Sequence, residues 1–187
     1  MNSQKLVNGL DNLVSQTRSM MNEKNITSYL ILTKSYFSRA IVVNEDMNKS
    51  EEDFLINDFE AFIFWQENAK CFVKFIDKDF SYRQLEFNKC DFLRLDKNSI
   101  SLILKEEVLP VAVIDDGKEV YLVEPIDRKT TFYFAHGNSR EFPDFYFNGI
   151  TKSNLNYNLN SKLQIWNLYQ TCHKTIDENI EILRKKQ

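Results

Sequence analysis

The middle of the chain, from about residue 27 to residue 135, alternates apolar and polar residues and has only short polar links between its apolar segments. β-Branched and aromatic side chains dominate these segments, as is typical of strands. A parallel sheet needs crossovers of a dozen or more residues, usually helical, and this region offers none. We therefore expect an antiparallel meander of about six to eight strands. The expected strands cover residues 61–66, 70–77, 84–95, 99–104, 109–126 as a hairpin, and 129–135.

The hairpin over Leu109–Ile126 has its turn at Asp116-Gly117, which supplies the positive φ angles of a tight connection. Pairing Asp115 with Lys118 makes one face wholly apolar and the other mostly apolar. Antiparallel strands with two apolar faces are typical of a buried position. We therefore expect this hairpin to lie inside the sheet and not at a solvated edge.

Both ends of the chain have the periodicity of amphipathic helices. Near the N-terminus, over about residues 3–23, Leu6, Leu10, Leu13, Thr17 and Met20 follow one helical face. Near the C-terminus, over about 161–185, the stripe contains Trp166, Tyr169, His173, Ile176, Ile180 and Leu183. These stripes can pack on the chain's own sheet, which we expect, on each other, or on a second copy, which leaves a homo-oligomer through the terminal helices open.

Two segments are less well determined. Residues 26–43 fit either a helix or two strands, and the strand runs 29–33 and 40–43 favour strands. Residues 44–53 are polar and charged, which predicts a loop. The fold expected for residues 1–187 is a single α+β domain, in which the meander is flanked by the two helices and an aromatic loop spans 136–160.

The composition excludes several protein classes. Hydrophobic residues make up 43 % and charged residues 27 %, as in an ordinary globular protein. The net charge of −3 disfavours a nucleic-acid partner, and no apolar run approaches the about 18 residues of a membrane span. The N-terminus lacks the apolar core of a secretory signal.

Three widely spaced cysteines, Cys71, Cys90 and Cys172, do not resemble a disulfide framework. We therefore predict free, buried cysteines and a cytoplasmic location.

The four glycines rule out the common nucleotide motifs, because a phosphate cradle or a dinucleotide fold requires glycines at fixed spacing. His136 and His173 have no histidine or cysteine at chelating distance except the adjacent Cys172. His173 lies in the helical stripe, which favours a packed side chain. We predict no cofactor and no metal site.

Carboxylates gather near the expected strand ends, at Asp77, Asp79, Asp115, Asp116 and Glu124. Such residues hold Mg²⁺ in nucleases. Glu124, however, is followed by Pro125-Ile126 and lacks the lysine of the restriction-type pattern. Turns and exposed faces explain these residues better.

The densest aromatic region is the segment from Phe132 to Phe147, in which seven of sixteen residues are aromatic. Phe132 and Phe134 alternate as core residues of a strand do. Beyond them, three consecutive aromatics cannot all face one side of a strand, and an exposed aromatic beside arginine is typical of a binding surface. A loop that packs back on the final helix is the alternative. The predicted binding residues are His136, Asn138, Arg140, Phe142, Phe145, Tyr146 and Phe147.

These observations favour a non-catalytic cytoplasmic protein that binds a protein partner, of the inhibitor, immunity or adaptor type. Two alternatives stay open. One is an enzyme with an unfamiliar site, either a metal-dependent phosphodiesterase or nuclease at Asp115, Asp116 and Glu124, or a hydrolase using His136 as a base. The other is a structural subunit of a viral or larger assembly.

Overall fold

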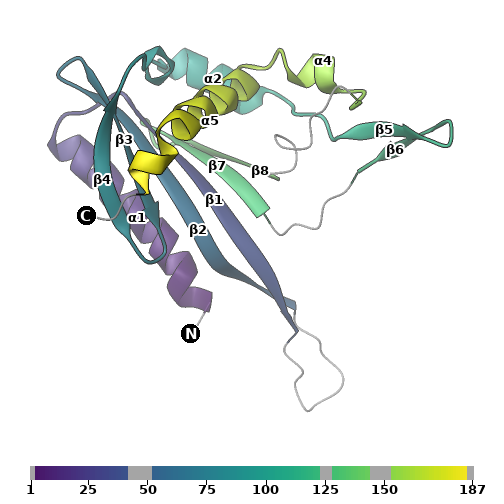
Figure 1. Ribbon diagram of the computed structural model, residues 1–187, viewed down its shortest axis with the longest axis horizontal. Coiled ribbons are helices and arrows are strands. Elements are labelled where there is room, and N and C mark those ends of the chain that lie inside the picture. The colour runs from purple at the N-terminus through teal and green to yellow at the C-terminus, as the bar shows by residue number, and fades with distance from the viewer. Residues whose placement is uncertain (1–2, 42–51, 123–127, 144–152, 185–187) are drawn as a thin grey trace.

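The computed structural model describes residues 3–41, 52–122, 128–143 and 153–184, with side chains described for 9–36, 58–122, 128–143 and 153–184. A six-stranded antiparallel sheet has helix α1 (Ser3–Glu23) on one face and helix α5 (Gln164–Leu183) on the other, as Figure 1 shows. The α+β class and the antiparallel sheet are confirmed. The strands of this sheet are β1 (Tyr29–Ile41), β2 (Glu52–Glu67), β3 (Lys70–Asp77), β4 (Ser81–Phe87), β7 (Arg128–Phe134) and β8 (Ser139–Pro143).

The sheet order is β4-β3-β2-β1-β7-β8. Strands β1 to β4 form the expected meander, and the β7–β8 hairpin then adds to the free edge of β1. The preference for strand over helix in residues 26–43 is therefore confirmed by β1, although one continuous strand replaces the two expected runs and residues 42 and 43 lie outside the described residues. Leu32 lies at the centre of the sheet, opposite Phe62 on β2 and Phe132 on β7.

Side chains of β1 alternate between two separate cores. Leu30 and Leu32 belong to the α5-side core, whereas Tyr29 and Ile31 belong to the α1-side core. All four side chains are buried. Because the sheet is covered on both faces, β1 is apolar at four consecutive positions from Tyr29 to Leu32, as expected for a strand with two buried faces.

Both terminal helices turn their apolar faces to this sheet. On α1 the buried residues are Leu10, Val14, Thr17 and Met21. Compared with the predicted stripe, Val14 is buried in place of the half-buried Leu13, and Met21 in place of the exposed Met20. On α5, four of the predicted stripe residues are buried and His173 and Ile180 are half-buried. Apart from the exposed Met20, the described residues of both stripes are buried or half-buried within the chain. The four buried residues on α5 are Trp166, Tyr169, Ile176 and Leu183.

The predicted strand over 99–104 is wrong, because this segment belongs to helix α2 (Lys97–Lys105). Asp96 begins the helix, its side chain accepting a hydrogen bond from Ser99 N at 2.7 Å. Ile100 and Ile103 are buried three residues apart, while Leu102 is exposed. A short apolar run is compatible with either a helix or a strand, and here the N-cap residue Asp96 favours the helix. The predicted strand over 84–95 is likewise divided, into β4 and the short 3-10 helix η1 (Asp91–Leu93).

The turn and pairing of the predicted hairpin are confirmed, but its predicted position is wrong. Strands β5 (Ala112–Asp115) and β6 (Lys118–Tyr121) pair Asp115 with Lys118 around Asp116 and Gly117, whose φ angles are 46° and 75°. They form a separate two-stranded sheet that extends away from the large sheet in Figure 1. Every residue of β6 is exposed. The alternation of apolar residues in this hairpin therefore does not correspond to buried side chains.

Cys71 on β3 and Cys90 before η1 form a disulfide, with Cα atoms 5.8 Å apart. The prediction that all three cysteines are free is therefore wrong. The two cysteines are 19 residues apart in sequence, and the fold brings both into the α5-side core. Cys172 is free and buried.

Two further elements lie in the predicted aromatic loop over 136–160, which is therefore only partly a loop. They are β8 and the one-turn helix α4 (Tyr157–Asn160). Of the predicted loop over 44–53, residues 44–51 lie outside the described residues and residues 52 and 53 begin β2. Among the helices that the structure describes, none combines the length and hydropathy of a transmembrane span.

Candidate functional site

The predicted binding residues fall into three groups. His136 and Asn138 are exposed on the turn between β7 and β8, where Gly137 adopts a φ of 88°. Arg140 and Phe142 lie on β8 and contact the interior. Phe145, Tyr146 and Phe147 lie outside the described residues. The structure therefore does not bring the described members together on one surface.

Arg140 is held within the molecule. Its guanidinium donates hydrogen bonds to the carbonyl oxygens of Ile103 and Glu106, at the end of α2. The guanidinium carbon also lies 4.7 Å from the centre of the Phe142 ring. Burial lowers the pKa of Arg140, and the nearby Glu106 carboxylate partly opposes this shift. Arg140 thus joins β8 to α2.

Phe142 is only 5 % exposed and belongs to the α5-side core. Its ring meets that of Phe132 edge-on, with the centres 6.3 Å apart. A side chain in this position stabilises the sheet through burial. Phe142 is therefore not available to a partner in this structure.

The described carboxylates of the catalytic alternatives lie at turns. Asp115 and Asp116 are exposed at the hairpin turn, and Glu124 lies outside the described residues. Asp77 accepts hydrogen bonds from Asp79 N, Phe80 N and the Tyr82 hydroxyl, and therefore organises a turn. In the part of the chain that the structure describes, no group of three or more His, Cys, Asp or Glu side chains is arranged to hold a metal ion.

His173 contacts Tyr169 on the same helix, with ring centres 4.1 Å apart. The histidine is half-buried beside the α5-side core residue Tyr169. This contact agrees with the packed position predicted from the helical stripe.

The largest concentration of exposed apolar side chains lies on and beside the β5–β6 hairpin. Six of the ten large hydrophobic residues that are exposed in the described chain are found there. Single exposed hydrophobic residues are common, but a group of this kind is typical of an interaction surface. We call this group the hairpin patch. Ile114 and Tyr121 lie on one face of the hairpin and Val120 and Leu122 on the other, while Leu155 and Leu159 lie in the segment that holds its base.

Buried asparagines hold the base of the hairpin to the rest of the molecule. The side-chain oxygen of Asn160 accepts from Leu109 N, and its amide nitrogen donates to the Leu109 carbonyl, both at 2.9 Å. Asn154 accepts from Ala112 N at 3.0 Å, and Asn156 donates to the Pro110 carbonyl at 2.9 Å. The hairpin is therefore fixed at its base, although its tip is exposed.

These asparagines were missed by the sequence interpretation. The signal is the run Ser153-Asn154-Leu155-Asn156-Tyr157-Asn158-Leu159-Asn160, in which asparagine occupies every second position. Asn154 and Asn160 are 2 % and 1 % exposed, which is unusual for an amide unless it is hydrogen-bonded. The sequence alone does not show which main-chain groups they contact.

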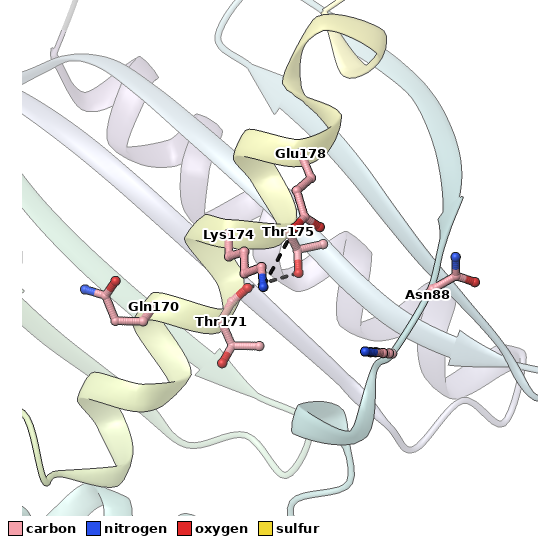
Figure 2. Close-up of a pocket in the computed structure, with 7 residues that line it drawn as sticks. Asn88, Gln170, Thr171, Lys174, Thr175 and Glu178 are labelled. Carbon is pink, nitrogen blue, oxygen red and sulfur yellow. Dashed lines mark hydrogen bonds and ion pairs between the residues drawn. The ribbon is translucent and has the colours of Figure 1, made fainter.

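A polar pocket of about 560 Å³ lies between α5 and the segment after β4. Figure 2 shows Lys174 and Glu178 extending from the same helix; Nζ of Lys174 lies 3.9 Å from Oε1 of Glu178. The hydroxyls of Thr171 and Thr175 donate to carbonyls within α5. Much of the polar lining is thus already engaged, which makes this pocket a weaker candidate than the hairpin patch. The lining residues are Asn88, Lys89, Gln170, Thr171, Lys174, Thr175 and Glu178.

Comparisons with models of known protein families, with curated proteins and with solved structures find no match to this chain. The residues and their geometry are therefore the basis for a functional proposal.

Proposed function

We propose that this chain is a non-catalytic protein-binding module of the inhibitor, immunity or adaptor type, and that the hairpin patch is its contact surface. The observation that carries the proposal is the hairpin itself. It is anchored at its base by buried hydrogen bonds, yet it exposes Ile114 by 58 % and Tyr121 by 56 %. Exposing such side chains to water is unfavourable unless a partner covers them.

Tyr121 gives the patch a residue type that is enriched at interfaces. Tyrosine offers a large apolar ring with one polar end and loses little conformational entropy when it binds. Here the Glu119 carboxylate accepts a hydrogen bond from the Tyr121 hydroxyl and raises the pKa of Tyr121. Ile114 lies on the same face of the hairpin as Tyr121 and can help to exclude water from the contact.

We therefore propose the hairpin patch as the contact surface, in place of the surface predicted around His136. Arg140 and Phe142 make internal contacts, so their removal would weaken the fold as well as any binding. Ile114 and Leu159 are more than half exposed, and changes there act on binding with little effect on folding.

A photo-crosslinking amino acid at Leu159 tests the proposal in a lysate of the source organism. We expect a crosslinked protein that is lost when the same chain also carries Ile114→Ser and Tyr121→Ser. The matched control places the crosslinker at Leu102, which is equally exposed at 57 % but lies on α2. Identical crosslinked species from both positions, or a Leu159 species unaffected by the two serines, would contradict the proposal.

The cytoplasmic location also belongs to the proposal, and the Cys71–Cys90 disulfide makes it testable. Disulfides persist in oxidising compartments and are rare in the reducing cytoplasm. A cytoplasmic chain would keep this pair reduced in the cell and would form the disulfide only on oxidation after extraction, so rapid thiol trapping in intact cells should label both cysteines. Trapping that finds the pair oxidised would place the chain elsewhere.

A further inference from the structure

We propose that β6 pairs along its outer edge with β6 of a second copy of this chain, so that the two hairpins form one continuous, two-fold symmetric antiparallel sheet. This inference rests on the proposed function, because it names one occupant of the hairpin patch. It uses the hairpin and not the terminal helices, whose buried faces pack on the chain's own sheet.

The main-chain hydrogen bonds of the hairpin determine which groups face outward. Leu122 N donates to the Val111 carbonyl at 2.8 Å, and Val113 pairs with Val120. Main-chain groups in an antiparallel pair point alternately toward and away from the neighbouring strand. Those of Val120 therefore face β5, whereas those of Glu119 and Tyr121 face away from it. Among the described residues, no hydrogen bond is made by the outward main-chain groups of Glu119 or Tyr121.

The outer edge of β5 is closed at its base. Ala112 N donates to Oδ1 of Asn154 at 3.0 Å, and the Ala112 carbonyl accepts from Leu155 N at 2.8 Å. These contacts occupy the outward groups of Ala112. An added strand therefore finds a continuous edge on β6 and not on β5.

Three symmetric registers can align outward groups of one β6 with those of the other. One places Glu119 opposite Glu119 of the second copy, where like charges repel. Another places Tyr121 opposite its own counterpart and leaves Glu119 without a partner inside β6. The third places Glu119 opposite Tyr121, which makes two hydrogen-bonded pairs, each exchanging both N–H···O bonds. The third register therefore has the most main-chain bonds and opposes no like charges.

Side chains favour the same register. It places Val120 directly opposite Val120 of the second copy, on the face that already pairs Val113 with Val120. A continuous row of valines then crosses the joined sheet, and β-branched side chains pack well in such rows. On the other face, each Tyr121 lies opposite Glu119 of the second copy, whose carboxylate can replace the chain's own Glu119 as the acceptor of the Tyr121 hydroxyl hydrogen bond.

The contact is small compared with a stable dimer interface of about 1,200–2,000 Å². We therefore expect a weak, concentration-dependent dimer. In sedimentation equilibrium with the full chain, the average mass should rise from 22.2 kDa toward twice that value as the concentration increases into the millimolar range.

Tyr121→Pro separates edge pairing from folding. Proline removes only the N–H of residue 121, which faces outward, so the hydrogen bonds to β5 stay intact. We expect dimerisation to weaken at least tenfold, with an unchanged circular dichroism spectrum. The matched control Tyr121→Val removes the aromatic ring but keeps the N–H, and should weaken dimerisation less than proline does. Equal weakening by both variants would overturn the main-chain pairing.

Cysteine crosslinking tests the register. In the proposed pairing the two Val120 Cα atoms lie about 4.5 Å apart, within disulfide range, whereas the two Tyr121 Cα atoms lie about 9 Å apart. We expect Val120→Cys to form a disulfide-linked dimer at least tenfold faster than Tyr121→Cys. Equal rates, or a wild-type chain that stays monomeric at every concentration, would overturn the inference. Continued capture of another protein at Leu159 in that case would leave the proposed function intact.

Discussion

Asn160 hydrogen-bonds both main-chain groups of Leu109, accepting from its N–H and donating to its carbonyl at 2.9 Å each. The two residues are 51 positions apart in sequence. A side-chain amide here takes the place of a neighbouring strand, and with Asn154 and Asn156 it fixes where the hairpin leaves the body of the protein. The position of the candidate binding surface therefore depends on these amides.

Replacing Asn160 with alanine tests this dependence. The variant leaves two main-chain groups of Leu109 without their partner, which should lower the free energy of unfolding by about 2–4 kcal/mol. Urea unfolding monitored by circular dichroism measures the change. Asn158→Ala is the matched control, since Asn158 is exposed on the same turn of helix, and should change stability by less than about 0.5 kcal/mol. Similar losses for both variants would argue against a specific role for Asn160.

Glu106 caps the N-terminus of α5, because its carboxylate oxygens accept from Gln164 N and Ile165 N at 2.8 Å each. Glu106→Ala should lower the free energy of unfolding by about 1–2 kcal/mol, as expected for a lost cap. Glu106→Gln keeps one acceptor oxygen and should cost less. The neighbouring exposed residue Glu107, changed to alanine, provides the control in the same thermal or urea titration. A null effect of Glu106→Ala would show that the contact does not stabilise α5.

The Cys71–Cys90 disulfide closes a loop of 19 residues. In the chain-entropy treatment a loop of this length stabilises the folded state by about 3 kcal/mol, so Cys71→Ser combined with Cys90→Ser should lose about that amount. Reduction of the wild type should produce a similar loss and have no further effect on the double variant. A reductant effect of equal size on the double variant would contradict this assignment.

Cys172 should resist alkylation in the folded protein. It is fully buried, and burial raises the pKa of its thiol, which keeps the reactive thiolate scarce. Mass spectrometry after treatment with iodoacetamide at pH 8 should find no label before unfolding and one label afterwards, with the disulfide intact. Rapid labelling of the folded chain would contradict the packing of α5.

Tyr133 should contribute to alkaline unfolding. Burial, and secondly the charge of Asp11, raise the pKa of Tyr133 above its ordinary value near 10. The neutral hydroxyl is therefore favoured in the folded state. Its stabilising contribution is fully present below pH 10 and is lost as the pH rises through the folded pKa. We expect Tyr133→Phe to flatten the decline in unfolding free energy above pH 10. An unchanged slope would contradict this assignment.

The sequence by itself determined the features that depend on neighbouring residues. Period-two alternation with short links required antiparallel strands, and helical periodicity determined α1 and α5. The turn at Asp116-Gly117 followed from the positive φ that glycine adopts without strain. These properties are local, so a window of a few residues contains the information.

Only the tertiary structure decided what each surface faces. The alternation in β5 and β6 is the same whether the hairpin is buried or exposed, and the large sheet is completed by β7 and β8 instead. In the sequence Arg140 has the features of a binding residue, but in the structure its guanidinium donates to the carbonyls of Ile103 and Glu106 at the end of α2. Hydrogen bonds and disulfides join residues that are far apart in sequence, and no local pattern specifies those partners.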